Sequence, residues 1–195
     1  MRFVGVSVGL IILSSGLARS AEEPKVLTKV TPLPVALSKD FQFRKTKLYF
    51  LSEQDSHTVE QKGAAPTKPG KLSGTTPSSK SATVQDASIA FERRYHLFGA
   101  VTALDRRQRV GNYLDFFWRA MRPADVVVRL EYRQEKLHSH VQAQEISCPN
   151  VHGNRQTEFK VVGDDYFDDG RVIAWRCLLI ENGAIVAENR SYLWE

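Results

Sequence analysis

The chain has 195 residues, two cysteines and a formal net charge of +5, and this length is sufficient for one domain with a hydrophobic core. The charge does not indicate a nucleic-acid interface, because residues 89–195 carry 15 basic and 15 acidic side chains and the excess lies in the first half of the chain. A nucleic-acid binder would instead gather basic residues on a folded face.

The first twenty residues have the three-part layout of a cleavable secretory signal. Arg2 precedes the apolar run 3–13, and the small residues Ala18 and Ser20 lie just before Ala21. A membrane-spanning helix needs about 20 apolar residues, and this run is shorter. We therefore expect cleavage between Ser20 and Ala21, a secreted or periplasmic protein, and no transmembrane segment after cleavage.

Residues 21–55 are expected to form a loose N-terminal segment that contains one strand, residues 41–51. This stretch is rich in aromatic and aliphatic residues. Because a single strand is not stable in water, we expect it to pair with the C-terminal domain. The alternative is a terminal arm that becomes ordered only with a partner.

Residues 56–88 differ sharply in composition from the rest of the chain. They include six Ser, five Thr, three Pro, three Gly and four Lys, and they lack aromatic residues. Such a segment cannot bury enough apolar surface to offset the entropy lost on ordering. The sequence therefore predicts a disordered linker or a long loop that ends at residue 88.

Residues 89–195 have the alternating patterns of a β domain. Residues 89–102 are expected to open it as two short strands, and 105–109 to form a solvated arginine-containing loop. Strict apolar alternation over 111–120 and 126–133 predicts two strands, each with one buried face, joined by a turn over residues 122–125. Weaker strands are expected over 140–146 and 157–162.

The last part of the domain is expected to be a hairpin. Residues 172–180 and 185–194 flank Asn182-Gly183, and Asn-Gly favours a type I′ turn because both residues tolerate positive φ. A two-residue loop would pair Ile180 with Ile185, Trp175 with Arg190 and Ile173 with Tyr192. No segment has a convincing helical period.

About seven short strands with turn signals every 8–12 residues predict an all-β fold, an antiparallel β-sandwich of the immunoglobulin-like kind. Trp175-Arg176-Cys177, preceded by the acidic turn 168–170, resembles the F strand of an immunoglobulin domain. Cys148 is too close to Cys177 for the usual immunoglobulin pair, and no Trp lies between them. The resemblance is thus to the architecture that immunoglobulin and fibronectin type III domains share.

Two cysteines in an exported chain make Cys148 and Cys177 candidates for a disulfide, with two buried thiols as the alternative. His138 and His140 would share one strand face near Cys148 and His152, but this spacing matches no zinc pattern. Residues 164–170 contain four carboxylates, yet Phe167 takes the place of a calcium ligand. We therefore predict no metal and no cofactor.

The chain has no Gly-x-Ser-x-Gly or His-Glu-x-x-His motif of a hydrolase. Trp175, Tyr192 and Trp194 could together form an aromatic surface for a sugar ring or a protein partner. The sequence favours an exported, non-enzymatic binding or structural module whose partner is a protein or glycan of the cell envelope or exterior. A carbohydrate-binding module is the first alternative, and a small secreted hydrolase is the second.

Overall fold

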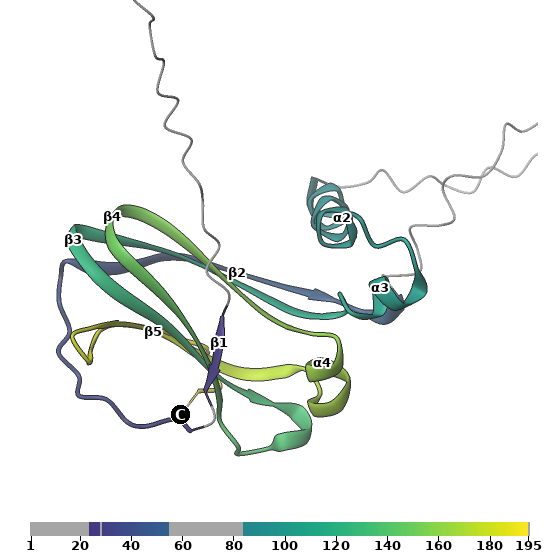
Figure 1. The fold of residues 1–195 in the computed structure, drawn as a ribbon. Coiled ribbons are helices and arrows are strands. Elements are labelled where there is room, and N and C mark those ends of the chain that lie inside the picture. Colours follow the sequence, from purple (N-terminus) through teal and green to yellow (C-terminus); the bar gives the residue numbers. More distant parts are fainter. Residues whose placement is uncertain (1–23, 28, 55–83, 195) are drawn as a thin grey trace, which may run out of the picture.

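A computed structural model describes residues 24–27, 29–54 and 84–194 (Figure 1). The predicted signal cleavage between Ser20 and Ala21 and most of the predicted linker, residues 56–83, lie outside the described residues. Within the described part, no helix is long and apolar enough to cross a membrane.

The described residues form one six-stranded antiparallel sheet, which confirms the predicted all-β, sandwich-like fold. The strand order is β1-β4-β3-β5-β6, and β2 pairs with β3 beside this path. The strands are β1 (Lys25–Leu27), β2 (Phe41–Leu51), β3 (Gly111–Gln134), β4 (Gln142–Val162), β5 (Val172–Glu181) and β6 (Ala184–Arg190). The helices are α2 (Val84–Leu97), α3 (Ala103–Arg107), α4 (Asp164–Asp169) and the short 3-10 helix η2 (Glu135–Leu137).

Strands β3 and β4, of 24 and 21 residues, each join two of the predicted strands, so the turn expected over residues 122–125 is wrong. β3 runs through that position with register shifts on either side of Ala124. Pro123 and Pro149 have no N–H to donate, and Asn150 (φ 46°) and Gly153 (φ 80°) adopt positive φ. Such bulges bend paired strands without ending them, and both strands therefore bend at the same level.

The bend brings the two halves of the sheet together around one apolar core. β2 pairs with residues 111–120 of β3, whereas β5 pairs with residues 127–134. Phe116 from the first half packs edge-on against Trp175 of β5, with ring centroids 5.2 Å apart. The predicted inward-facing residues of β3 are all buried in this core: Leu114, Phe116, Trp118, Ala120, Val126, Val128, Leu130 and Tyr132.

The N-terminal segment is part of the sheet rather than a separate segment. The predicted strand 41–51 is β2 with the same bounds, and it pairs with β3, which confirms the expected pairing across the linker. Residues 34–38, expected to be loose, bond to β6: Ala36 N donates to the Ile185 carbonyl at 2.8 Å, and Ser38 N donates to the Val186 carbonyl at 2.9 Å.

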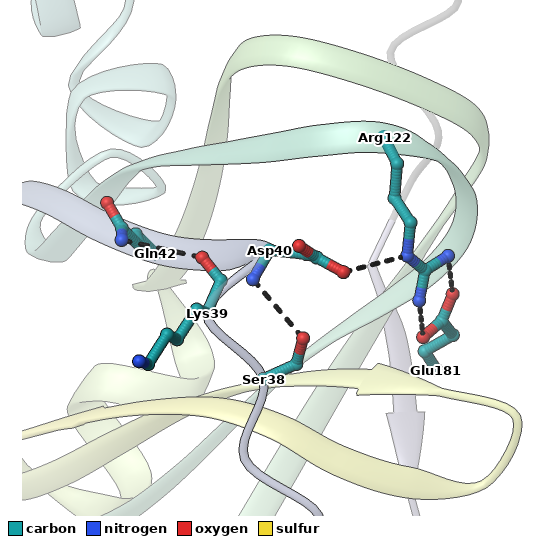
Figure 2. A network of polar contacts seen from close by, with 6 residues as sticks. All are labelled: Ser38, Lys39, Asp40, Gln42, Arg122 and Glu181. Atoms are coloured by element: carbon teal, nitrogen blue, oxygen red, sulfur yellow. Dashed lines mark hydrogen bonds and ion pairs between the residues drawn. The ribbon is translucent and has the colours of Figure 1, made fainter.

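Arg122, at the bend of β3, connects the sheet to two distant segments (Figure 2). Its Nε donates to Asp40 at 3.1 Å, just before β2, and its two terminal nitrogens bind Glu181 at 2.7 and 2.6 Å. Bidentate arginine–carboxylate pairs fix geometry, although exposed pairs contribute little stability. Arg122 thus orients the β5–β6 hairpin against the start of β2.

The prediction of a chain without helices is wrong. Residues 84–88, assigned by composition to the linker, and residues 89–97, expected as strand, form α2 instead. Ala, Glu and Arg at its central positions are good helix formers, and Gly99 (φ 82°) follows its C-terminus. The expected arginine loop is α3, which begins with a capping box between Thr102 and Asp105, a standard helix start.

The C-terminal hairpin has the predicted turn, with Asn182 at φ 50° and Gly183 at φ 77°. Ile180 pairs with Ile185 as expected. A bulge then shifts the register by one residue, so that Arg190 lies opposite Arg176 rather than Trp175, and β6 ends before Tyr192. The extra residue on β6 lets Val186 and Ala187 both reach the main core.

Candidate interaction surface

We call α2, α3 and the turn between them the arm, residues 84–107. It lies beside the end of the sheet formed by β2 and β3 (Figure 1). The arm attaches through the end of α2, where His96 and Leu97 are buried. Leu97 packs with Leu51 of β2 and Tyr113 of β3 in a small apolar cluster that is separate from the main core.

His96 is stacked against two tyrosines. Its ring lies 3.8 Å from Tyr113 and 5.0 Å from Tyr49, with interplanar angles of 30° and 18°. Glu92, one turn earlier in α2, approaches the imidazole at 3.8 Å and also pairs with Lys47 of β2 at 3.6 Å. Burial lowers the pKa of His96 below 6.5, and the carboxylate of Glu92 opposes that shift. The neutral imidazole therefore suits this docked position.

Arg109 holds the end of α2 in place. One of its guanidinium nitrogens donates to the carbonyls of His96 at 2.8 Å and Phe98 at 2.7 Å. These are carbonyls that a helix end leaves without intrahelical partners, and a cation there also complements the helix dipole. The Tyr113 hydroxyl donates to the Arg109 carbonyl at 2.6 Å. The turn after α2 is therefore anchored to β3.

The outer side of the arm is apolar and exposed. Phe91 and Tyr95 are four residues apart on one face of α2, and Phe98 follows three residues later, just after the helix ends. The Phe91 and Tyr95 rings are stacked, with centroids 6.5 Å apart. The large exposed apolar side chains of the arm are Ile89 (52%), Phe91 (60%), Tyr95 (63%), Phe98 (82%), Val101 (79%) and Leu104 (63%). A surface helix normally presents a polar face to water.

The second helix of the arm is fixed to the rest of the fold. The Arg107 guanidinium lies 4.4 Å from the ring of Phe167 in α4, and Gly163 N donates to the Val110 carbonyl at 2.9 Å. Residues 105–109 are exposed or partly exposed, as predicted, but 105–107 are helical, and Arg107 and Arg109 also contact other parts of the fold. Val101 and Leu104 are 79% and 63% exposed.

The predicted aromatic surface of Trp175, Tyr192 and Trp194 does not form. Trp175 is 8% exposed and Trp194 is 6% exposed, whereas Tyr192 is 97% exposed. Trp175 belongs to the main core. Trp194 is covered by Arg133 and Arg176, whose guanidinium carbons lie 4.8 and 5.2 Å from its ring centroid. These rings therefore do not make a shared platform.

The predicted disulfide is wrong for this structure, since Cys148 and Cys177 are both thiols. Cys148 lies opposite Val126 and Cys177 lies opposite Leu130, on either side of β3. Four residues of a strand span about 13 Å, whereas bridged Cα atoms are at most about 7 Å apart. Burial raises the pKa of the Cys177 thiol well above its usual value, as for a packed core residue.

The residues considered for metal binding are not brought together. His138 and His140 are exposed in the loop after β3, and His152 is exposed in the far half of β4. The acidic segment 164–169 is the helix α4 rather than a turn. Within the described ranges, no group of three or more His, Cys, Asp or Glu side chains could hold a metal ion.

A buried charge network crosses the outer face of β4, β3 and β5, which the sequence did not reveal. Arg129 bonds Glu145 at 2.6 Å and lies 3.6 Å from Glu131, and Glu131 binds Arg176 at 2.7 Å. Arg129 also donates to the Thr31 carbonyl at 3.2 Å. The two arginines and two carboxylates of this network neutralise one another, which leaves no charge for a ligand. The bond from Arg129 to the Thr31 carbonyl fastens the N-terminal segment to the sheet.

A shallow groove of ≈ 810 Å³ lies between the edges of β2 and β6. Asn189 of β6 donates to Thr46 of β2 across it at 2.7 Å. The β2 edge carries a register shift at Arg44 and the charged side chains of Lys45 and Lys47. Bulges and lysines are features that protect sheet edges from added strands. The arm is therefore the stronger candidate surface.

Comparison of the chain with protein-family models, with curated proteins and with solved structures gave no match.

Proposed function

We propose that this chain is an exported, non-enzymatic binding module and that the apolar face of the arm is its binding surface. The observation that carries the proposal is the exposure of Phe91, Tyr95, Phe98, Val101 and Leu104, which are between 60% and 82% accessible. Contiguous apolar patches on soluble proteins mark sites of protein or membrane interaction. Export is the sequence expectation, from the signal layout of residues 1–20.

The fixed geometry of the arm supports a binding role. Arg109, the Thr102–Asp105 capping box and the Arg107–Phe167 contact all hold the turn that presents Phe98 and Val101. A surface held in its bound conformation loses less entropy on binding. The carbohydrate-binding alternative has less support, because Trp175 and Trp194 are buried and a sugar platform needs exposed rings.

The test is site-specific photo-crosslinking in cells that express the chain with its signal. A benzophenone side chain replaces Phe98 in one variant and Tyr192 in the other. Both positions are exposed aromatics, but Tyr192 lies outside the arm. The expected result is a light-dependent adduct, protein or lipid, at position 98 and none at position 192. Equal adducts at both positions, or none at either, would contradict the proposal.

A further inference from the structure

We infer that the arm docks on an anionic phospholipid surface, with Phe98, Val101 and Leu104 inserted among the acyl chains and arginines at the headgroups. This inference rests on the proposed function and names the partner of that same surface. It is carried by the shape of the arm, its charge, its area and the composition of the rest of the chain.

The position of the arm leaves its turn at the edge of the molecule. The arm lies beside the end of the β2–β3 sheet (Figure 1), and the three inserted residues come from the turn after α2 and the start of α3. Phe98 is 82% exposed and Val101 is 79% exposed. A rigid protruding apolar tip fits a deformable lipid interface, in which interfacial helices bury one apolar face.

The charge of the arm complements anionic phosphate. From Arg93 to Leu104 the sequence contains two arginines and no acidic residue. The nearest carboxylates are engaged within the protein, since Glu92 pairs with Lys47 and Asp105 accepts from the backbone of Thr102. Arg94 is exposed on the apolar side of α2. Basic residues beside an apolar face favour membranes that contain anionic lipids.

The area of the arm is small for a stable protein interface. Six large apolar side chains are exposed on it, from Ile89 to Leu104. A stable protein–protein interface includes about 20–30 residues on each partner. Insertion into lipid does not require a matching partner surface, so this area argues for a membrane rather than for a second copy of the chain.

The polar segment that joins β2 to the arm is a poor cover for it. In residues 55–83 the bulky apolar residues are Val59 and Leu72, and the rest are polar, charged, Gly, Ala or Pro. Two such residues cannot bury the five strongly exposed side chains of the arm. The occupant is therefore sought outside the chain.

The test is vesicle flotation of the chain from Ala21 onward. One set of vesicles is phosphatidylcholine with about one third phosphatidylglycerol, and the other is phosphatidylcholine alone. The expected result is binding to the anionic vesicles, lowered at least about tenfold by the double variant F98S/V101S. The matched control Y192S/L193S removes two exposed apolar residues outside the arm and is expected to bind like the wild type.

The charge contribution is tested separately with Arg94→Gln, which is expected to weaken binding to anionic vesicles by about fivefold. Circular dichroism verifies that every variant is folded. Equal binding of wild type and F98S/V101S, or equal binding to both vesicle types, overturns the inference.

Two further outcomes separate the inference from the proposed function. A protein adduct at position 98 without vesicle binding overturns the membrane inference and leaves the binding module in place. A dimer in light scattering that F98S/V101S abolishes assigns the surface to a second copy, which also overturns the inference. Absence of both adducts and vesicle binding overturns both proposals.

Discussion

The imidazole of His96 stacks on the ring of Tyr113, with centroids 3.8 Å apart, and this contact joins the arm to β3. Because burial lowers the pKa of His96 below 6.5, the unfolded or undocked state binds a proton more readily than the docked state. The stability from this contact is therefore present above about pH 6.5 and is lost as pH falls through the lowered pKa.

We predict that the arm loosens on acidification while the main core stays folded. Hydrogen exchange of α2 amides measured at about pH 7.5 and about pH 5.5, corrected for intrinsic rates, should show lower protection at the acidic pH. The charged groups around the imidazole are Glu92, Asp115, Lys160 and Arg109. The variant His96→Phe keeps a stacked ring and should remove the pH dependence, so a pH effect that persists in it would contradict the assignment.

Arg109 is predicted to determine the order of the turn after α2. Arg109→Ala removes the donor to the His96 and Phe98 carbonyls, and the loss of such bonds to a charged group destabilises by about 1–3 kcal/mol. Hydrogen exchange in residues 95–101 should increase, with little change in β3. The control is Arg94→Ala, which changes an exposed arginine of α2, with an expected effect below about 0.5 kcal/mol. Equal exchange in both variants would contradict this role.

Glu131 is predicted to be the most sensitive acidic residue of the sheet. It is 2% exposed and lies between Arg129 and Arg176. Glu131→Gln leaves two mostly buried cations with one carboxylate fewer, and breaking a buried pair destabilises by about 3 kcal/mol or more. The control Glu188→Gln changes an exposed acidic residue of β6. Denaturant unfolding measures both, and similar midpoints would show that the network is not stabilising.

The two thiols are predicted to differ in reactivity. Cys177 is fully buried, and its raised pKa disfavours the reactive thiolate. Cys148 is half-buried near the bend of β4. A thiol reagent should therefore modify Cys148 first in the native protein and both cysteines in denaturant. If mass spectrometry found neither cysteine modified in denaturant, the two cysteines would be joined in a disulfide.

The sequence predicted those parts of the fold in which the polarity of each residue matches its burial. Alternation over residues 126–133 identified the buried face of β3, because one side of each strand faces the core. The turn expected over 122–125 was wrong because proline, here Pro123, occurs in β-bulges as well as in turns. Only the pairing of β3 with β4 distinguishes a bulge from a turn.

The arm was missed because α2 lacks the usual division into a polar and an apolar face. Helical periodicity is recognised when apolar residues face the core and polar residues face water, whereas here Phe91 and Tyr95 are exposed and His96 is buried. The spacing of these three residues, Gly99 after them and the Thr102–Asp105 pair are the local signals that could have identified the helices. The aromatic surface of Trp175, Tyr192 and Trp194 failed for another reason, since composition does not distinguish a core ring from an exposed one.

The β5–β6 turn is the place where a single backbone conformation can be tested directly. Gly183 has φ 77°, and a Cβ built on it would have no heavy atom within 4 Å. The effect of Gly183→Val is therefore expected to come from placing a β-branched residue at positive φ, about 1–3 kcal/mol.

The matched control is Ala184→Val, one residue later, where β6 begins and pairs with Glu181. β-branched residues are favoured in strands, so this variant should stay within about 0.5 kcal/mol of wild type. Arg190→Ala should also have little effect, because the observed register places Arg190 opposite Arg176 and not against Trp175. Equilibrium denaturation of the three variants is the measurement. If Gly183→Val were as stable as wild type, the turn would not be type I′, and the pairing that carries Val186 and Ala187 into the core would need a different register.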